Sequence, residues 1–156
     1  MSKTRQEVVF IKHIAETFNT FVNKNRYVKT SDKNAMKNFA KHAIKHLEEF
    51  DKPVELEWIP VIGRFKNHRR KKRGYDVLNY VHQYKYSEDM LTELSKIVDD
   101  NNKYVKRHTM HVPLDKPDFE GRGILLIITE VDDKGLKKIE DRKESLFEKW
   151  RKENDE

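Results

Sequence analysis

Three aspartates near the middle of the chain have the side-chain type that a divalent cation binds. Asp76 follows a run of basic residues, and Asp99 and Asp100 stand together further along. Mg²⁺ prefers oxygen ligands, and a protein commonly supplies one or two carboxylates while water and phosphate oxygens complete the octahedron. Two or three aspartates beside cationic side chains can therefore form a site that cleaves a phosphodiester. Lys85 is then available to stabilise charge on the phosphate or on the leaving oxygen.

Each of these side chains also has a simpler interpretation. Asp76 stands where a helix would begin, and as an N-cap it would accept a backbone N–H, which is worth about 1 kcal/mol. Asp99 and Asp100 belong to the sequence VDDNNK, which is rich in turn-forming residues. Lys85 and Asp89 have i,i+4 spacing, at which a solvated pair on a helix contributes about 0.2–0.5 kcal/mol. Spacing alone leaves both interpretations open.

A dense basic run precedes Asp76. Residues 64–73 read RFKNHRRKKR, with seven Lys or Arg and no acid, whereas the chain from Asp132 onward has nine acids and eight bases. The net charge of +6 is therefore concentrated locally, as contact with phosphates requires. A solvated loop before a helix would have the same composition. The candidates for holding a nucleic-acid backbone are Arg69, Arg70, Lys71, Lys72 and Arg73.

The helix that follows the basic run poses a geometric problem for a shared metal site. Apolar residues recur at helical spacing from Val77 to about Ile97. A straight helix of that length would hold Asp76 and Asp100 about 30 Å apart, because each residue adds about 1.5 Å. Either the helix ends early, near Leu91 to Ser95, and the chain folds back, or the carboxylates meet across a dimer interface.

The remaining elements predict an α+β domain with a mixed sheet of about four strands packed against helices. We expect strands over 7–14, 54–65, 102–114 and 121–131, and a helix that begins at Ser31 or Asp32 and runs to about Phe50. The buried face of that helix is predicted to include Ala35 and Phe39. Pro60 favours an edge position or a bulge, because proline has no N–H for the ladder. A charged helix over 134–156 closes the chain as a C-terminal extension of a single domain, 1–156.

Composition excludes several other classes of protein. There are no cysteines, so structural disulfides and thiolate zinc sites are excluded. No apolar run approaches the roughly 18 to 20 residues that span a membrane, and the N-terminal sequence MSKTRQE contains no hydrophobic signal segment. We therefore expect a soluble cytoplasmic protein without a membrane partner.

The motifs together resemble a known family. RRKKRGYDVLNYVHQYKYSEDMLTELSKIVDDNNKYV, followed by GRGILLIITEV, is similar to the RusA-type crossover-junction endodeoxyribonucleases, which are common in phages and prophages. The matching positions are Asp76 with Asn79, Lys85, the Asp-x-Leu of Asp89 to Leu91, and the pair Asp99–Asp100. Gly74 stands where the family has the first Asp of its motif, and the C-terminal helix falls outside the likeness.

The resemblance implies a Holliday junction resolvase that acts in phage recombination or repair inside a bacterial host. It implies a homodimer that binds branched DNA and cuts it symmetrically with Mg²⁺, for which Mn²⁺ is an acceptable substitute. The metal ligands would be Asp76, Asp99 and Asp100, and Lys85 would complete the catalytic set. Because Gly74 removes one expected ligand, the alternative is a catalytically impaired protein that binds junction or duplex DNA without cutting it. Another acid, such as Glu88, could also take the missing ligand's place.

Overall fold

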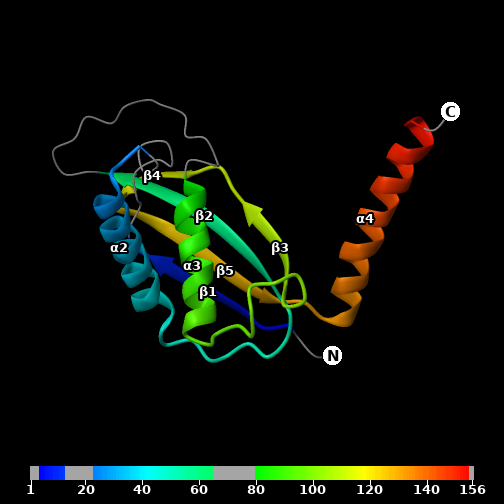
Figure 1. Ribbon diagram of the computed structural model, residues 1–156, viewed down its shortest axis with the longest axis horizontal. Coiled ribbons are helices and arrows are strands. Elements are labelled where there is room, and N and C mark those ends of the chain that lie inside the picture. Colours follow the sequence, from blue (N-terminus) through cyan, green and yellow to red (C-terminus); the bar gives the residue numbers. More distant parts are fainter. Residues whose placement is uncertain (1–3, 13–22, 65–79, 155–156) are drawn as a thin grey trace.

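The fold is α+β, as the sequence predicts. The computed structural model describes residues 4–12, 23–64 and 80–154, which form three helices and five strands (Figure 1). Their order is β1 (Gln6–Ile11), α2 (Arg26–Ile44), β2 (Val54–Arg64), α3 (Val81–Glu93), β3 (Val105–Met110), β4 (Leu114–Glu120), β5 (Arg122–Glu130) and α4 (Asp133–Asn154). Within these ranges no helix is long and apolar enough to span a bilayer.

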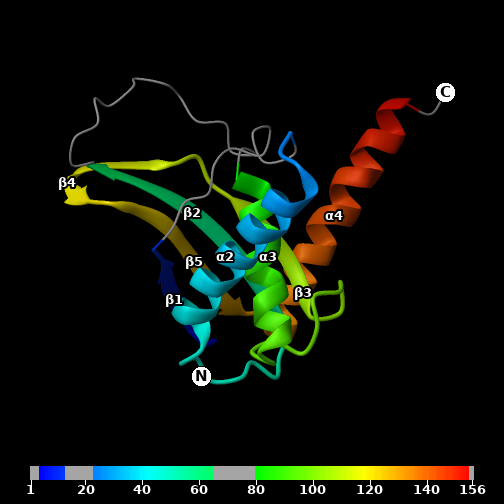
Figure 2. The same ribbon diagram turned by 60° about the vertical axis from the view of Figure 1, so that its left-hand side comes forward.

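The five strands form one mixed sheet in the order β1-β5-β2-β3, and β4 also pairs with β2. β5 is antiparallel to both β1 and β2, whereas β2 is parallel to β3 and to β4. The predicted strand over 54–65 is confirmed as β2, and its side chains alternate: Val54, Leu56 and Trp58 are buried and the glutamates between them are partly exposed. α2 and α3 lie side by side over one face of the sheet (Figure 2).

Pro60 lies in a strand that has partners on both sides, but at Pro60 itself only one side of β2 is paired, which agrees locally with the predicted edge position. It pairs with Ile124 of β5 on one side. On the other side the pairing of β2 with β3 ends at Trp58 and the pairing with β4 begins at Val61. Pro60 therefore falls in the interval between two partner strands, where its missing N–H removes no bond from either ladder.

The sequence did not predict β4, in which every residue is exposed. It continues through a turn at Gly121, whose φ of +102° suits glycine, into β5. At the far end of β2 the chain approaches this turn closely. A Cβ on Gly63 would collide with the carbonyl oxygens of Gly121 and Phe119, so only glycine fits there.

α2 begins earlier than predicted, at Arg26, because the Asn25 side chain caps it by accepting a hydrogen bond from Val28 N at 3.0 Å. The side chains that pack on the core are also one position out of phase with the prediction. Met36, Ala40 and Ile44 are buried, whereas Ala35 and Phe39 face solvent.

α4 stands apart from the sheet and from the other two helices (Figure 1; Figure 2). None of its residues is buried, and the large apolar side chains of Leu146, Phe147 and Trp150 are more than half exposed. This arrangement agrees with a predicted helical extension that adds little to the core of the domain.

Candidate functional site

The site begins where α3 ends, and α3 ends with a Schellman motif. Lys96 N donates to the Leu91 carbonyl at 2.8 Å, and Ser95 N donates to the Thr92 carbonyl at 3.0 Å. Ser95 between them has a φ of +55°, the left-handed conformation that this motif requires. The chain therefore reverses direction directly after Glu93. Of the two alternatives left open by the sequence, the structure therefore has the helix that ends early, between Leu91 and Ser95.

The reversal brings Asp100 back to α3, where Lys85 bridges two carboxylates. Lys85 Nζ lies 3.1 Å from Asp89 Oδ1, one turn further along the helix, and 3.1 Å from Asp100 Oδ2. Asp99 fixes the turn that carries Asp100: its Oδ1 accepts from Asp100 N at 2.8 Å, and its Oδ2 accepts from the Asn101 side chain at 3.1 Å. We call Lys85, Asp89 and Asp100 the lysine cluster.

Charge in the lysine cluster shifts two pKa values in the directions that keep both groups ionised. Partial burial alone would lower the pKa of Lys85, but its hydrogen bonds to Asp100 and Asp89 outweigh that effect and raise the pKa. The hydrogen bond from Lys85 lowers the pKa of Asp100 despite an opposing effect of burial. The cluster is therefore a cation held between two carboxylates at neutral pH.

The structure brings together part of the predicted site. Lys85, Asp99 and Asp100 lie on neighbouring segments, as proposed for a common site. Asp76 and the basic residues Arg69, Arg70, Lys71, Lys72 and Arg73 lie outside the described residues, as does Asn79.

Polar residues of α3 differ in their exposure. Lys85 is exposed and Asp89 partly exposed, which suits the solvated i,i+4 pair expected from their spacing. His82, three residues before Lys85, is only 5% exposed. α3 therefore buries more of its circumference than its apolar residues alone indicate.

The carboxylate of Asp100 is of the type that Mg²⁺ binds. It is partly exposed, and Mg²⁺ sites commonly need one or two carboxylates plus waters, but the ammonium of Lys85 competes for the same carboxylate. Asp99 has both oxygens engaged in the turn, which suits a supporting acid. Across residues 4–12, 23–64 and 80–154, no three His, Asp or Glu side chains gather in a way that could hold a metal ion. The site would therefore need Asp76.

A second pair of ionisable groups joins α3 to β3 beside the lysine cluster, and no pattern in the sequence indicates this pairing. The side chain of Glu88 is only 6% exposed, and its Oε2 lies 2.7 Å from Nε2 of His108 on β3. The His108 ring is stacked on Trp58, with centroids 5.6 Å apart and an interplanar angle of 8°. The hydrogen bond to Glu88 raises the pKa of His108, although burial and the nearby charge of Lys85 oppose the shift.

Trp58 anchors this pair to the core. Its indole Nε1 donates to Ser87 Oγ at 3.0 Å, and Ser87 Oγ donates to the Tyr84 carbonyl at 2.6 Å. The rings of Trp58 and Tyr84 are also stacked, with centroids 5.3 Å apart. His108 therefore stacks on a buried ring that is itself hydrogen-bonded to α3 at the residue before Glu88.

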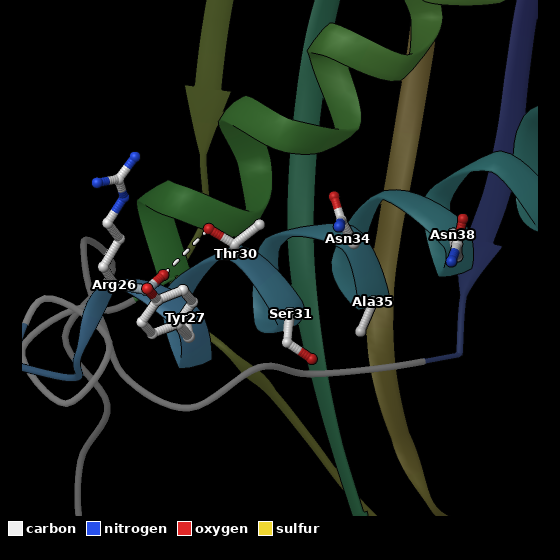
Figure 3. Close-up of a pocket in the computed structure, with 7 residues that line it drawn as sticks. All are labelled: Arg26, Tyr27, Thr30, Ser31, Asn34, Ala35 and Asn38. Atoms are coloured by element: carbon white, nitrogen blue, oxygen red, sulfur yellow. Dashed lines mark hydrogen bonds between the residues drawn. The ribbon is translucent and has the colours of Figure 1, made fainter.

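A polar hollow lies along the outer side of α2 (Figure 3). The Tyr27 ring is 85% exposed there, and Thr30 Oγ1 donates to the Arg26 carbonyl at 3.0 Å. The hollow has the kinds of side chain that contact nucleic acid: a cationic group, an exposed aromatic ring, hydroxyls and amides. It is lined by Arg26, Tyr27, Thr30, Ser31, Asn34, Ala35 and Asn38.

No known protein family matches the chain, and no curated protein matches its sequence at a significant level. The likeness to the junction endonucleases therefore rests on the motif positions alone.

Proposed function

We propose that the protein is a Mg²⁺-dependent endonuclease that binds and resolves branched DNA. The observation that supports this most directly is the return of Asp100 to Lys85 after α3 ends at Glu93. It places an acid and a cation from two motif segments at one point, as a phosphodiester-cleaving site needs. A continuous helix would have kept them apart.

In this proposal Asp76 and Asp100 hold the metal, and Asp99 acts as a supporting acid that fixes the turn of Asp100. Bound Mg²⁺ would supply Lewis-acid stabilisation of the phosphate and activation of a water. Lys85 stays protonated, because its carboxylate partners raise its pKa, and it can neutralise charge on a non-bridging phosphate oxygen. Asp89 holds the Lys85 side chain in place from the same helix.

The basic run Arg69–Arg73 would hold the DNA backbone. Contacts of this kind position the duplex without reading its sequence. Each neutralised phosphate contributes about 0.9 to the slope of log K against log salt concentration. Replacing all five residues by Gln should weaken junction binding at low salt and flatten that slope by several units. An unchanged slope would place the DNA elsewhere, for example on the hollow along α2.

A homodimer belongs to this proposal, because a two-fold protein would present two equivalent sites to a two-fold junction. Sedimentation equilibrium of the free protein, and of the protein with one junction, tests it. One site per junction at saturation would contradict symmetric cutting.

The test of cleavage is Mg²⁺-dependent nicking of a synthetic four-way junction. Wild type should nick it, and Asp76→Asn and Asp100→Asn should not. Asp51→Asn is a matched control, since Asp51 is an exposed aspartate before β2. Full activity in both site variants would eliminate the metal-site assignment.

A second candidate is a protein that binds junctions without cutting them. Two observations favour it: Gly74 stands where the family motif has an Asp, and the ammonium of Lys85 already neutralises Asp100. Such a protein would bind junctions tightly and never cleave them with Mg²⁺ or Mn²⁺. Gly74→Asp should then restore cleavage, and its failure to do so would show that the missing ligand is not the explanation.

A further inference from the structure

We propose that His108, oriented by Glu88, is the general base that takes a proton from the attacking water. This inference rests on the proposed nuclease function and adds a residue from β3 to it. The sequence suggested Glu88 only as a possible replacement for the missing motif Asp, and His108 occupies no motif position. The two lie in separate elements and meet only in the folded chain.

The hydrogen bond to Glu88 leaves one ring nitrogen of His108 available. A carboxylate accepts hydrogen bonds, so Glu88 Oε2 holds the tautomer in which Nε2 carries the hydrogen. The lone pair is then on Nδ1, which has no hydrogen-bond partner among the described residues. The His108 side chain is 42% exposed, so water and substrate can reach it. A fixed tautomer with an accessible lone pair is what a general base requires.

The dyad lies beside the lysine cluster. Glu88 and Lys85 are three residues apart on α3, a spacing that places them on the same side of the helix. Their partners, His108 and Asp100, belong to β3 and to the turn that precedes it. Lys85 and Glu88 of α3 therefore both contact the same stretch of chain, residues 100–108.

The surroundings of His108 favour the protonated form that the reaction would create. From α3 it faces the Glu88 carboxylate, which favours the imidazolium, and Lys85, which opposes it. From β2 it faces the uncharged Trp58 ring. Because the Glu88 carboxylate is buried, little water competes for its negative charge. The net pKa of His108 is raised, so the ring holds the proton that it takes from water more firmly than a free imidazole would.

The step balances as follows. Nδ1 of His108 takes a proton from water while the water oxygen forms a bond to phosphorus. The bond from phosphorus to the 3′ oxygen breaks, and the 3′ oxygen keeps the electron pair and takes a proton from solvent. The imidazolium then releases its proton to solvent, so the products are a 5′-phosphate and a 3′-hydroxyl.

A purely structural pair would also hold β3 against α3, so the test needs a matched pair elsewhere. β3 is followed by one: His111 Nε2 lies 2.6 Å from Glu57 Oε2, and the His111 side chain is 41% exposed. Glu57, however, is a residue of β2, and the motif helix α3 takes no part in this pair. His111→Gln therefore removes a similar histidine–glutamate contact without touching the proposed base.

The experiment measures single-turnover junction cleavage against pH for wild type, His108→Gln, Glu88→Gln and His111→Gln, with junction affinity measured in parallel. His108→Gln should lower the rate by about 100- to 10,000-fold, the usual contribution of a general base. It should leave junction affinity unchanged. It should also abolish the fall in cleavage rate at acidic pH, which is the acidic limb of the pH profile. Glu88→Gln should move that limb to lower pH, and NMR titration should show a lower pKa for His108. His111→Gln should behave as wild type.

Chemical rescue separates a base from a structural residue. Added imidazole should restore part of the activity of His108→Ala and none to Asp100→Asn. If His108→Gln fails to fold, the pH profile of Glu88→Gln decides. An unchanged acidic limb in a cleaving enzyme overturns this inference alone. Failure of wild type to cleave any branched DNA with Mg²⁺ or Mn²⁺ overturns the proposed function and this inference with it.

Discussion

Lys85 Nζ and Asp100 Oδ2 lie 3.1 Å apart, although a helix end and a complete reversal of the chain separate them in sequence. The reversal depends on Ser95, which adopts a left-handed conformation at a position where helices usually have glycine. The left-handed conformation of Ser95 is therefore part of the turn that brings Asp100 back to Lys85. The geometry of the proposed site depends on how α3 ends.

Ser95→Gly should stabilise the fold. Glycine adopts a φ of +55° without the penalty of about 1–2 kcal/mol that a Cβ incurs there. Part of this gain is offset because glycine loses more backbone entropy on folding than serine does. The net gain in the free energy of unfolding should be about 0.5–1 kcal/mol, measured by urea denaturation. Ser95→Ala keeps the Cβ and should show no gain. Equal stability of the glycine and alanine variants would contradict a strained C-terminus of α3.

The two carboxylates of the lysine cluster should differ in their effect on cleavage. Asp100→Asn removes a proposed metal ligand, so it should slow nicking by more than the roughly 10- to 100-fold typical of losing an outer-sphere partner. Asp89→Asn leaves the Lys85–Asp100 contact in place and should stay within that range. Single-turnover rates on a labelled junction measure both. Equal loss in the two variants would mean that Asp100 only positions Lys85.

Lys85→Met should separate metal binding from catalysis. The ammonium neutralises Asp100, so its removal should tighten Mn²⁺ binding, measured by titration calorimetry, while it slows cleavage. Lys85→Arg keeps the charge and should bind Mn²⁺ as wild type does. Weaker Mn²⁺ binding in Lys85→Met would show that Lys85 orders the carboxylates more than it competes with the metal.

Local pattern was enough to predict some elements and not others. β2 has alternating apolar residues on a strand that keeps one face on the core, so Val54, Leu56 and Trp58 were identifiable from the sequence. The end of α3 was not. Leu94 and Val98 continue its helical spacing, and no glycine marks the stop at Ser95. Periodicity reports which side chains are apolar, and it does not detect a backbone that turns away.

The site follows the same division. Lys85, Asp99 and Asp100 were identifiable because residue type and order along the chain suggested metal chemistry. The pairing of Glu88 with His108 was not. Glu88 was considered only as a possible replacement for the missing metal ligand, and its 2.7 Å contact with His108 depends on the packing of α3 against β3. Long-range pairs of this kind leave no local signal. The phase of α2 was also predicted wrongly, because Ala35 and Phe39 on its outer side have the spacing of a core face.

Removal of residues 134–156 should leave the domain folded and able to bind junctions. No residue of α4 is buried, so its deletion exposes little new apolar surface. The melting temperature should change by no more than a few degrees, since about 1 kcal/mol shifts a domain of this size by roughly 2–8 °C. Loss of junction binding in a folded truncation would assign the DNA contact to α4. The deletion also removes three exposed apolar side chains, those of Leu146, Phe147 and Trp150. The truncated protein should therefore be more soluble than the full-length one.

The Glu88–His108 pair should make stability depend on pH in a defined direction. The hydrogen bond between His108 and Glu88 raises the pKa of His108 in the folded chain above the unfolded value of about 6.5. Protonated His108 therefore stabilises the fold fully below the unfolded pKa, and this contribution is lost as pH rises through the folded pKa. The difference in free energy of unfolding between wild type and His108→Gln should be largest near pH 6 and should shrink toward about pH 9. Urea denaturation across this range measures it, with His111→Gln as the reference for loss of an exposed histidine. A difference that stays constant with pH would mean that His108 contributes through its stacking on Trp58 and not through its charge.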